Sequence, residues 1–189
     1  MFSPELHLSH TPATGLQPFF EAIQKTGKPK RVRKGEVIIR QGSPSTFLIY
    51  IRNGAFKTVV KTPRKNYVLA FTFADDIDCC PSALLNHRSN TFNIEAILDS
   101  DVLVCDFTLI KKYLGSEEHM RWVVSLLLHY ADFLETQLIE LLALTAEERY
   151  KKLLAHQPEK LNQVPLSLVA SYLGITVERL SRIRKKLKS

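Results

Sequence analysis

The chain has 189 residues, of which 45% are hydrophobic and 24% charged, so it can bury a core and does not have a disordered composition. Its formal net charge of +7 favours a polyanionic partner. No apolar run reaches the roughly 20 residues of a membrane span, and the N-terminus lacks the basic start and apolar segment of a secretion signal. We therefore expect a cytoplasmic protein without a membrane partner.

Cysteine and histidine content argues against a metal centre. Cys79, Cys80 and Cys105 are odd in number and two of them are adjacent, which does not suit a disulfide framework. The six histidines are scattered along the chain. Because zinc and iron–sulfur sites need about four ligands at workable spacing, we expect no metal ion and no iron–sulfur cluster.

The first half of the chain predicts one short helix followed by strands. Residues 1–15 are polar and interrupted by proline, which predicts a loosely held arm. Apolar residues on one face predict an amphipathic helix over Leu16 to Lys25. Short β-prone runs follow at close intervals, at residues 32, 37–39, 47–51, 56–60, 67–73, 92–97 and 102–106.

These runs predict an all-β unit. Asn53-Gly54 stands between two of them, and Asn-Gly is a strong hairpin signal because both turn positions favour positive φ. Short strands separated by regular turns indicate a closed or double-sheet β fold of barrel or jelly-roll type.

A long helix is expected after the strands. Phe107 to Tyr113 predicts a short helical connector, and Ser116 with the two glutamates after it has the pattern of a capped helix start. Apolar residues then recur at spacings of three and four for about three heptads, which is typical of a helix that packs on a partner helix. The stripe contains Met120, Val123, Leu127, Tyr130, Leu134, Leu138 and Leu141, with Val124, Ala131 and Leu142 beside it.

The far face of the same helix is also apolar, since Leu126, Leu128, Phe133 and Ile139 lie there. One β unit cannot cover both faces. We therefore expect a parallel homodimer formed through the helix of residues 116–142.

The C-terminal segment predicts three helices. Thr145 and the glutamates that follow begin the first, which ends before Pro158. The second has Leu166, Val169, Ala170 and Leu173 on one face. Gly174 then suits a left-handed helix end, and Thr176 suits the cap of the third helix. In that helix we expect a buried stripe of Val177, Leu180, Ile183 and Leu187.

Two short helices, a turn with glycine and a basic second helix predict a helix-turn-helix. Arg182 can bond guanine O6 and N7, Glu178 can accept from cytosine N4, and Ser181 can reach a base or a phosphate. The competing interpretation is an ordinary helical hairpin with a solvated basic face. The mixture of donors and acceptors on the exposed face favours DNA reading.

The stretch from Lys34 to Gly42, followed by Phe47 to Ile51 and Asn53-Gly54, resembles the cyclic-nucleotide-binding β-roll of Crp/Fnr transcription regulators. The resemblance covers nearly the whole chain. It implies an α+β fold with an N-terminal double-stranded β-helix, or jelly roll, a long dimerisation helix and a C-terminal helix-turn-helix. The implied domains are residues 1–113 for the N-terminal helix and sensor roll, 114–144 for the dimerisation helix and 145–189 for the DNA-binding domain.

The nucleotide pocket implied by this resemblance is degenerate. Family members that bind a cyclic nucleotide hold its ribose and phosphate with a Gly-Glu pair and then an Arg-Ser pair. Here Asp78-Cys79 stands in place of Gly-Glu, and Arg88-Ser89 reaches the second position only if the loop is shortened. The aspartates would repel a phosphate, so we expect no cyclic AMP. The candidate effector pocket contains Asp78, Cys79, Cys80, Arg88 and Ser89.

Cys79 and Cys80 allow two interpretations. They could sense oxidants or a small ligand, or they could be small apolar residues buried under a loop. Nothing basic flanks them, and the neighbouring aspartates would raise a thiol pKa, which favours the second interpretation.

Val177 to Arg182 resembles the recognition helix of the Fnr-like branch, whose members share the pattern V-E-x-x-S-R. The similarity implies that Glu178, Ser181 and Arg182 read a TTGA-like half-site, with Val177 on a thymine methyl, and that a dimer reads an inverted repeat. The expected DNA-binding residues are Thr176, Val177, Glu178, Arg179, Ser181, Arg182, Lys185 and Lys186. Family members usually continue into a β-wing, which we do not expect here.

The resemblance implies double-stranded DNA and a second copy as partners, and leaves open RNA polymerase and an unidentified small-molecule effector. The alternative function is a signalling or scaffold protein whose degenerate helix-turn-helix binds another protein. A cupin-like enzyme would need several metal ligands in the roll, where His87 is the only histidine, and the sequence has no nucleophile elbow or P-loop. We expect a protein that is not an enzyme and has no cofactor.

Overall fold

The strands of this chain form a roll of two antiparallel sheets. The fold is that of a computed structural model, which describes residues 17–156 and 158–188. One sheet has the order β1 (Lys28–Val32), β8 (Ser100–Asp106), β3 (Phe47–Asn53) and β6 (Ile77–Asp78). The other has the order β2 (Val37–Ile39), β7 (Asn93–Ala96), β4 (Ala55–Lys61) and β5 (Asn66–Phe73). The expected jelly roll is confirmed.

The middle of β3 is covered on both faces of its sheet, which explains its continuous apolar run. Ile49 and Ile51 of β3 point between the sheets with Phe56 of β4, in the core of the roll. Leu48, from the opposite face of β3, packs outward against helices. The run Phe47 to Ile51 is therefore apolar at successive positions rather than at alternate ones.

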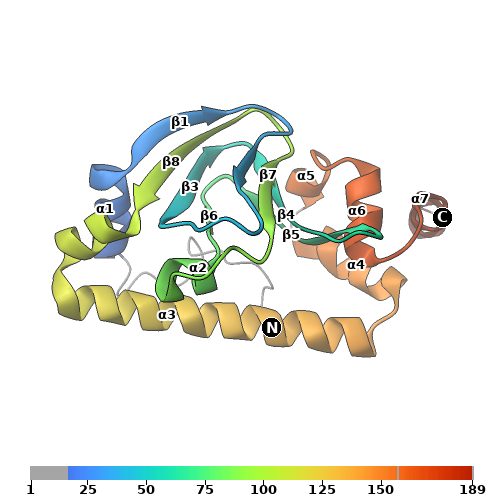
Figure 1. Ribbon diagram of the computed structural model, residues 1–189. Helices are drawn as coiled ribbons and strands as arrows, with labels where there is room; N and C mark the ends of the chain where they lie inside the picture. Colours follow the sequence, from blue (N-terminus) through green and yellow to red (C-terminus); the bar gives the residue numbers. More distant parts are fainter. Residues whose placement is uncertain (1–16, 157, 189) are drawn as a thin grey trace.

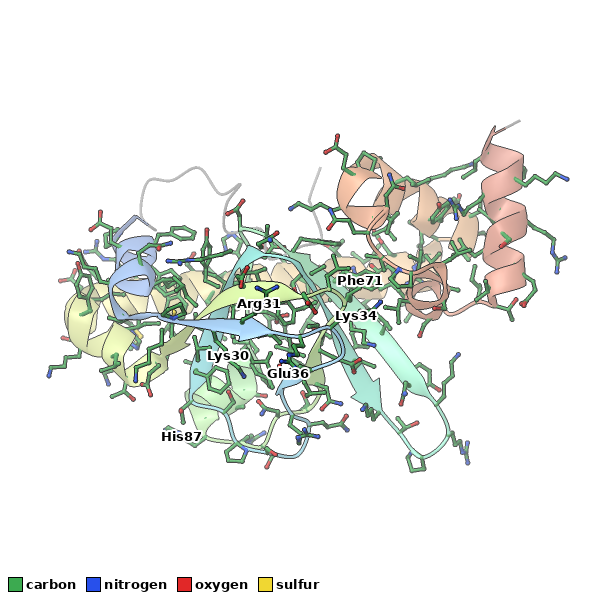
Figure 2. The ribbon with its side chains drawn as sticks, turned by 90° about the horizontal axis from the view of Figure 1, so that it is seen from above. Lys30, Arg31, Lys34, Glu36, Phe71 and His87 are labelled. Carbon is green, nitrogen blue, oxygen red and sulfur yellow. The ribbon has the colours of Figure 1, made fainter. Side chains whose placement is uncertain are left out.

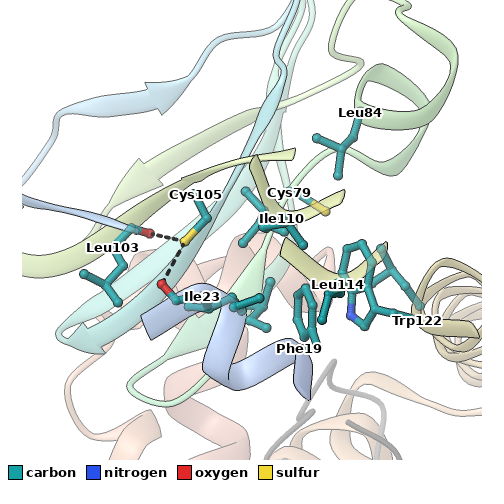
Figure 3. Close-up of a cluster of buried hydrophobic side chains, with 13 residues drawn as sticks. Phe19, Ile23, Cys79, Leu84, Leu103, Cys105, Ile110, Leu114 and Trp122 are labelled. Atoms are coloured by element: carbon teal, nitrogen blue, oxygen red, sulfur yellow. Dashed lines mark hydrogen bonds between the residues drawn. The ribbon is translucent and has the colours of Figure 1, made fainter. Parts of the chain in front are cut away.

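Two helices cover the outer face of the first sheet. These are α1 (Gln17–Thr26) and α3 (Phe107–Ala143), which runs beneath the roll in Figure 1. Phe19 of α1 stacks on Trp122 of α3, with ring centroids 4.0 Å apart. Figure 3 shows this cluster, in which the Cys105 thiol lies 3.9 Å from the Ile23 carbonyl oxygen. The α3 backbone breaks at Gly115, so Ser116 is the first residue after the break and not the expected cap.

The outer face of the second sheet carries the C-terminal helices. They are α4 (Ala146–His156), α5 (Pro158–Leu161), α6 (Leu166–Leu173) and α7 (Val177–Lys188), and Figure 1 shows them at the opposite end of the molecule from α1. A further short helix, α2 (Pro81–Asn86), lies between the roll and α3. None of the described helices is long and apolar enough to cross a membrane.

The hairpin expected at Asn53-Gly54 is wrong. β3 and β4 belong to different sheets, so the chain crosses from one sheet to the other at this point. Gly54 has φ of 109° and lies against Ser100, so it supports a close approach and not a two-residue turn. The hairpin joins β4 to β5 instead, and in its turn the Thr62 N–H donates to the Lys65 carbonyl oxygen at 3.2 Å.

Candidate DNA interface and effector pocket

The turn between α6 and α7 has the expected geometry. Gly174 ends α6 in the left-handed conformation, with φ of 71°, and its N–H donates to the carbonyl oxygens of Ala170 and Ser171. The Thr176 hydroxyl accepts the Arg179 N–H at 3.2 Å and so caps α7. Val169, Ala170 and Leu173 of α6 are buried. The two helices therefore meet as a helix-turn-helix.

The buried stripe expected on α7 is half correct. Leu180 and Ile183 are buried against α6 and its neighbours. Val177 and Leu187 are 37% and 36% exposed. They lie in the first and last turns of α7, and only the middle of the helix packs on the rest of the domain. Val177 is thus available at the surface.

The polar face of α7 is open. The residues exposed on or just before it are Thr176, Glu178, Arg179, Ser181, Arg182, Lys185 and Lys186. Hydrogen bonds from its own backbone N–H and the Thr176 hydroxyl hold the pKa of Glu178 below its usual value, helped by the charge of Arg182. Glu178 is therefore an ionised hydrogen-bond acceptor. The Lys186 ammonium lies 3.0 Å from a carboxylate oxygen of Glu147 on α4.

One face of α3 is apolar and exposed in the single chain. The expected stripe is corrected at two positions, because Val123 packs on the roll cluster and Tyr130 is half-buried. Leu126, which we expected on the far face, is fully buried under the roll. The exposed stripe has the regular spacing of four and three, and contains Met120, Val124, Leu127, Ala131, Leu134, Leu138 and Leu141.

Asp78 is the centre of a buried polar cluster inside the candidate effector pocket. The Thr72 hydroxyl on β5 donates to Asp78 on β6 at 2.9 Å. Burial, with a contribution from the charge of Asp76, raises the pKa of Asp78 to about 7 despite this bond. Burial also raises the pKa of Tyr130 on α3, and the nearby Cys80, Cys79 and Asp78 raise it further. β5, β6 and α3 thus meet at this acid.

The two cysteines are buried, as the second interpretation of the sequence holds, but their side chains face different cores. Cys79 packs in the cluster under α1 and α3, and Cys80 packs between the sheets. Burial raises the pKa of the Cys79 thiol strongly, and Asp78 adds to this effect.

Cys80 differs from the expectation of a raised pKa. Burial alone would raise the pKa of its thiol, but hydrogen bonding with Ser82 and Thr91 outweighs burial and lowers it. The Cys80 sulfur lies 3.5 Å from the Ser82 hydroxyl oxygen and 3.9 Å from that of Thr91. Charged neighbours alone therefore do not determine the pKa of this thiol.

Among the described residues, the hydrogen-bond partners of Cys80 are Ser82 and Thr91, and not Arg88 or Ser89. Arg88 and Ser89 are exposed in the loop after α2, and Ser89 pairs with Pro44. Thr91 reaches Cys80 instead, and the buried Asn90 donates to the carbonyl oxygens of Arg40 and Ser43. Sequence reasoning missed Thr72, Thr91 and Tyr130, because only the fold brings these elements together.

The described contacts of Asp78 and Cys80 are made by hydroxyl groups. Among the described residues, the hydrogen-bond partners of this cluster include no arginine or lysine side chain that could hold a phosphate. The carboxyl groups of Asp76 and Asp78 are both buried. Nor do the described residues place three or more metal-binding side chains together.

Comparison with known proteins agrees with this architecture. Residues 29–115 match the cyclic nucleotide-binding domain family. FixK2 from Bradyrhizobium japonicum is similar at a TM-score of 0.77 and 20% identity, covering 86% of this chain and 84% of that chain. A CooA mutant from Carboxydothermus hydrogenoformans is similar at a TM-score of 0.68 and 18% identity, covering 93% and 85%.

The chain has the Crp/Fnr fold. A third structure, the c-di-GMP responsive global regulator CLP of Xanthomonas campestris, is similar at a TM-score of 0.64 and 14% identity, covering 89% of this chain and 90% of that chain. No curated protein sequence matches the chain significantly. At these identities the likeness establishes the fold, and the ligand and the DNA site must be argued from the residues of this chain.

Proposed function

We propose that this chain is a dimeric, sequence-specific DNA-binding transcription regulator of the Crp/Fnr type, and not an enzyme. The proposal rests on α7, which has one buried apolar face and one exposed polar face. Leu180 and Ile183 anchor the helix in the core, while Glu178, Ser181 and Arg182 are exposed beside one another on its outer face. A firmly seated helix with a mixed donor and acceptor face suits the major groove.

The residues of α7 divide into reading and positioning roles. Arg182 would bond the guanine of a TTGA-like half-site, and the ionised Glu178 would accept from the cytosine on the opposite strand. Val177, exposed at the first turn, would contact a thymine methyl. Arg179 and Lys185 would contact phosphates, which fix the register without specifying sequence. Lys186 would do the same after leaving Glu147.

The exposed stripe of α3 supports a homodimer. Seven apolar positions at alternating spacings of four and three form the seam of a parallel two-helix pair. Pairing two chains along this helix would present two copies of α7 to an inverted repeat. Residues 1–113 would then act as the sensor unit, 114–144 as the dimerisation helix and 145–189 as the DNA-binding unit.

The effector of this regulator would not be cyclic AMP. Asp78, a buried acid whose pKa is raised to about 7, stands with Cys79 in place of the Gly-Glu pair. One structural neighbour is described as a c-di-GMP responsive global regulator. In this chain the described contacts of Asp78 include no arginine or lysine, so a ligand with a phosphate group is not favoured either.

Fluorescence anisotropy tests the proposal. The full chain is titrated into a duplex with inverted TTGA-like half-sites and into a scrambled duplex, each at two salt concentrations. We expect the specific duplex to bind at least about a hundredfold more tightly, and both duplexes to lose affinity with salt, because phosphate contacts release counterions. Replacing Arg182 and Glu178 by alanine should remove the preference.

Two results would contradict the proposal. A folded dimer that binds neither duplex would point to a helix-turn-helix used for protein binding. Equal affinity for both duplexes would show that the assigned half-site is wrong, and selection from random duplexes would then identify the site, or show that none exists.

A further inference from the structure

The C-terminal helices share one hydrophobic core with the sensor roll. Phe71 and Phe73 of β5 are buried beneath these helices, in a cluster with Val169 and Leu173 of α6 and Leu180 of α7. Figure 2 shows Phe71 where the roll meets the C-terminal helices. We call the unit formed by α4 to α7 the reading head. It is not tethered only through α3, since its core continues into the second sheet.

Tyr172 of α6 contacts both the roll and α3. Its ring lies 5.6 Å from the ring of Phe71. Its hydroxyl donates to the Gln137 side-chain oxygen on α3 at 3.2 Å. A single side chain thus joins the reading head to the roll and to the helix of the proposed dimer seam.

Charged residues of α4 also contact α6 and α3 at this junction. The Arg149 guanidinium of α4 lies over the Tyr172 ring at 5.7 Å and donates to the carbonyl oxygens of Tyr172 and Leu173. Lys152 of α4 pairs with the buried Glu140 of α3 at 2.9 Å. The end of α6 is therefore held by β5, by α3 and by α4 together.

These contacts leave the proposed DNA-reading face free. They involve α6, α4 and the buried side of α7, whereas Glu178, Ser181 and Arg182 stay exposed. Docking of the head on the roll therefore does not cover the reading residues. It restricts the directions in which α7 can point relative to α3.

We propose that Phe71 and Tyr172 are positioning residues that hold the two reading heads of the dimer in the orientation needed for an inverted repeat. The inference rests on the proposed function, since it concerns how a dimer engages two half-sites. Once one head has bound its half-site, a fixed orientation keeps the second head close to the second half-site, at a high effective concentration. Heads that swing freely would lose that advantage.

The test compares two duplexes of equal length. One carries an inverted repeat, and in the other one half-site is scrambled. Anisotropy is measured for the full chain, for Phe71→Ala and for Tyr172→Phe, which removes the hydroxyl that donates to Gln137. Leu69→Ala and Tyr67→Phe are matched controls, because both residues lie on β5 but are exposed and outside the shared core.

We expect Phe71→Ala to reduce the preference for the inverted repeat over the half-site duplex by about tenfold, and Tyr172→Phe by about threefold, while half-site affinity stays within about twofold. The controls should behave as wild type. A merely structural role would lower the affinity for both duplexes together, and that result overturns the proposal. If Phe71→Ala does not fold, Tyr172→Phe decides.

Two further results would also overturn the inference. An unchanged preference would show that docking does not orient the heads. A stronger preference in the variants would show that docking hinders DNA binding. If the wild type itself does not distinguish specific from scrambled duplexes, the proposed function fails and this inference with it.

Discussion

Among single residues, Asp78 is an acid whose protonation is changed by burial. Its pKa in the folded chain is about 7, against 3.8 for an exposed aspartate. The folded protein therefore keeps a proton that the unfolded chain releases between these two values. Because the folded state binds more protons in this window, stability falls as the pH rises from about 4 to about 7.

Asp78→Asn should remove this dependence. Near pH 8 we expect the free energy of unfolding of the variant to exceed that of wild type by up to roughly 4 kcal/mol, and near pH 5 by much less, because the wild-type acid is then neutral. Urea unfolding at both pH values measures this. Asp132→Asn, at an exposed position of α3, is the control. Equal pH dependence of wild type and Asp78→Asn would contradict the assignment.

The neighbours of Asp78 in the fold could not be predicted from the sequence. The positions of Asp78, Cys79 and Cys80 follow from their place in the β-roll pattern. Thr72 and Tyr130 contact or perturb the same cluster only because β5 and α3 fold against β6. A hydroxyl facing an acid from another sheet leaves no periodic signal in the sequence.

At the scale of elements, α3 combines two faces with different partners. The heptad-like spacing is visible in the sequence, but it does not tell which leucines face the roll. Leu126 and Trp122 are buried beneath the roll, while Leu134 is 47% exposed. The structure separates the two faces because α3 passes the roll on one side only.

Leu134→Glu should separate the dimer. A carboxylate in the middle of the apolar seam would have to be buried without a partner, so we expect the dimer to be weakened by at least about 3 kcal/mol, more than a hundredfold in its Kd. Sedimentation equilibrium measures this. Ile139→Glu is a matched control, because Ile139 is also exposed but lies off the stripe. A dimer that persists in Leu134→Glu would show that another surface pairs the chains.

The crossing at Gly54 is a second feature of element scale. Asn53-Gly54 correctly predicts a turn. A turn between sheets and a hairpin have similar sequences, so only the fold shows which of the two this turn is. A Cβ at Gly54 would lie 2.0 Å from the Ser100 hydroxyl oxygen. At Gly42, which also has positive φ, a Cβ would meet nothing within 4 Å.

This contrast predicts the cost of a methyl group at each position. Gly42→Ala should lower the free energy of unfolding by about 1 kcal/mol through backbone strain alone. Gly54→Ala should lower it by at least about 3 kcal/mol, since strain and a steric clash act together. Denaturant unfolding of both variants checks the difference. Equal losses would show that β8 can move away from Gly54.

On the scale of the whole molecule, the order of the elements was predictable and their docking was not. Helix, roll, long helix and helix-turn-helix follow from periodicity and turn residues, because those signals are local. Phe71 and Tyr172 are far apart in the chain, and no pattern indicates that they share a core. The sequence therefore predicts the parts, and tertiary packing determines how the reading head meets the roll.

The shared core predicts joint unfolding. We expect fluorescence of Trp122, the chain's one tryptophan, to follow the roll and α3, and far-UV circular dichroism to follow all helices. Because the reading head shares its core with the second sheet, the two signals should give coincident transitions in urea. An earlier transition in circular dichroism would show that the head unfolds by itself.

In the proposed dimer, two reading heads bind two half-sites together. The affinity of the full chain can be measured for inverted repeats whose half-sites are moved apart in single base-pair steps. We predict one sharp maximum with centres about one helical turn, or 10 base pairs, apart, and a loss of at least about tenfold when about half a turn is inserted. Affinity that does not change with spacing would contradict a dimer with oriented heads.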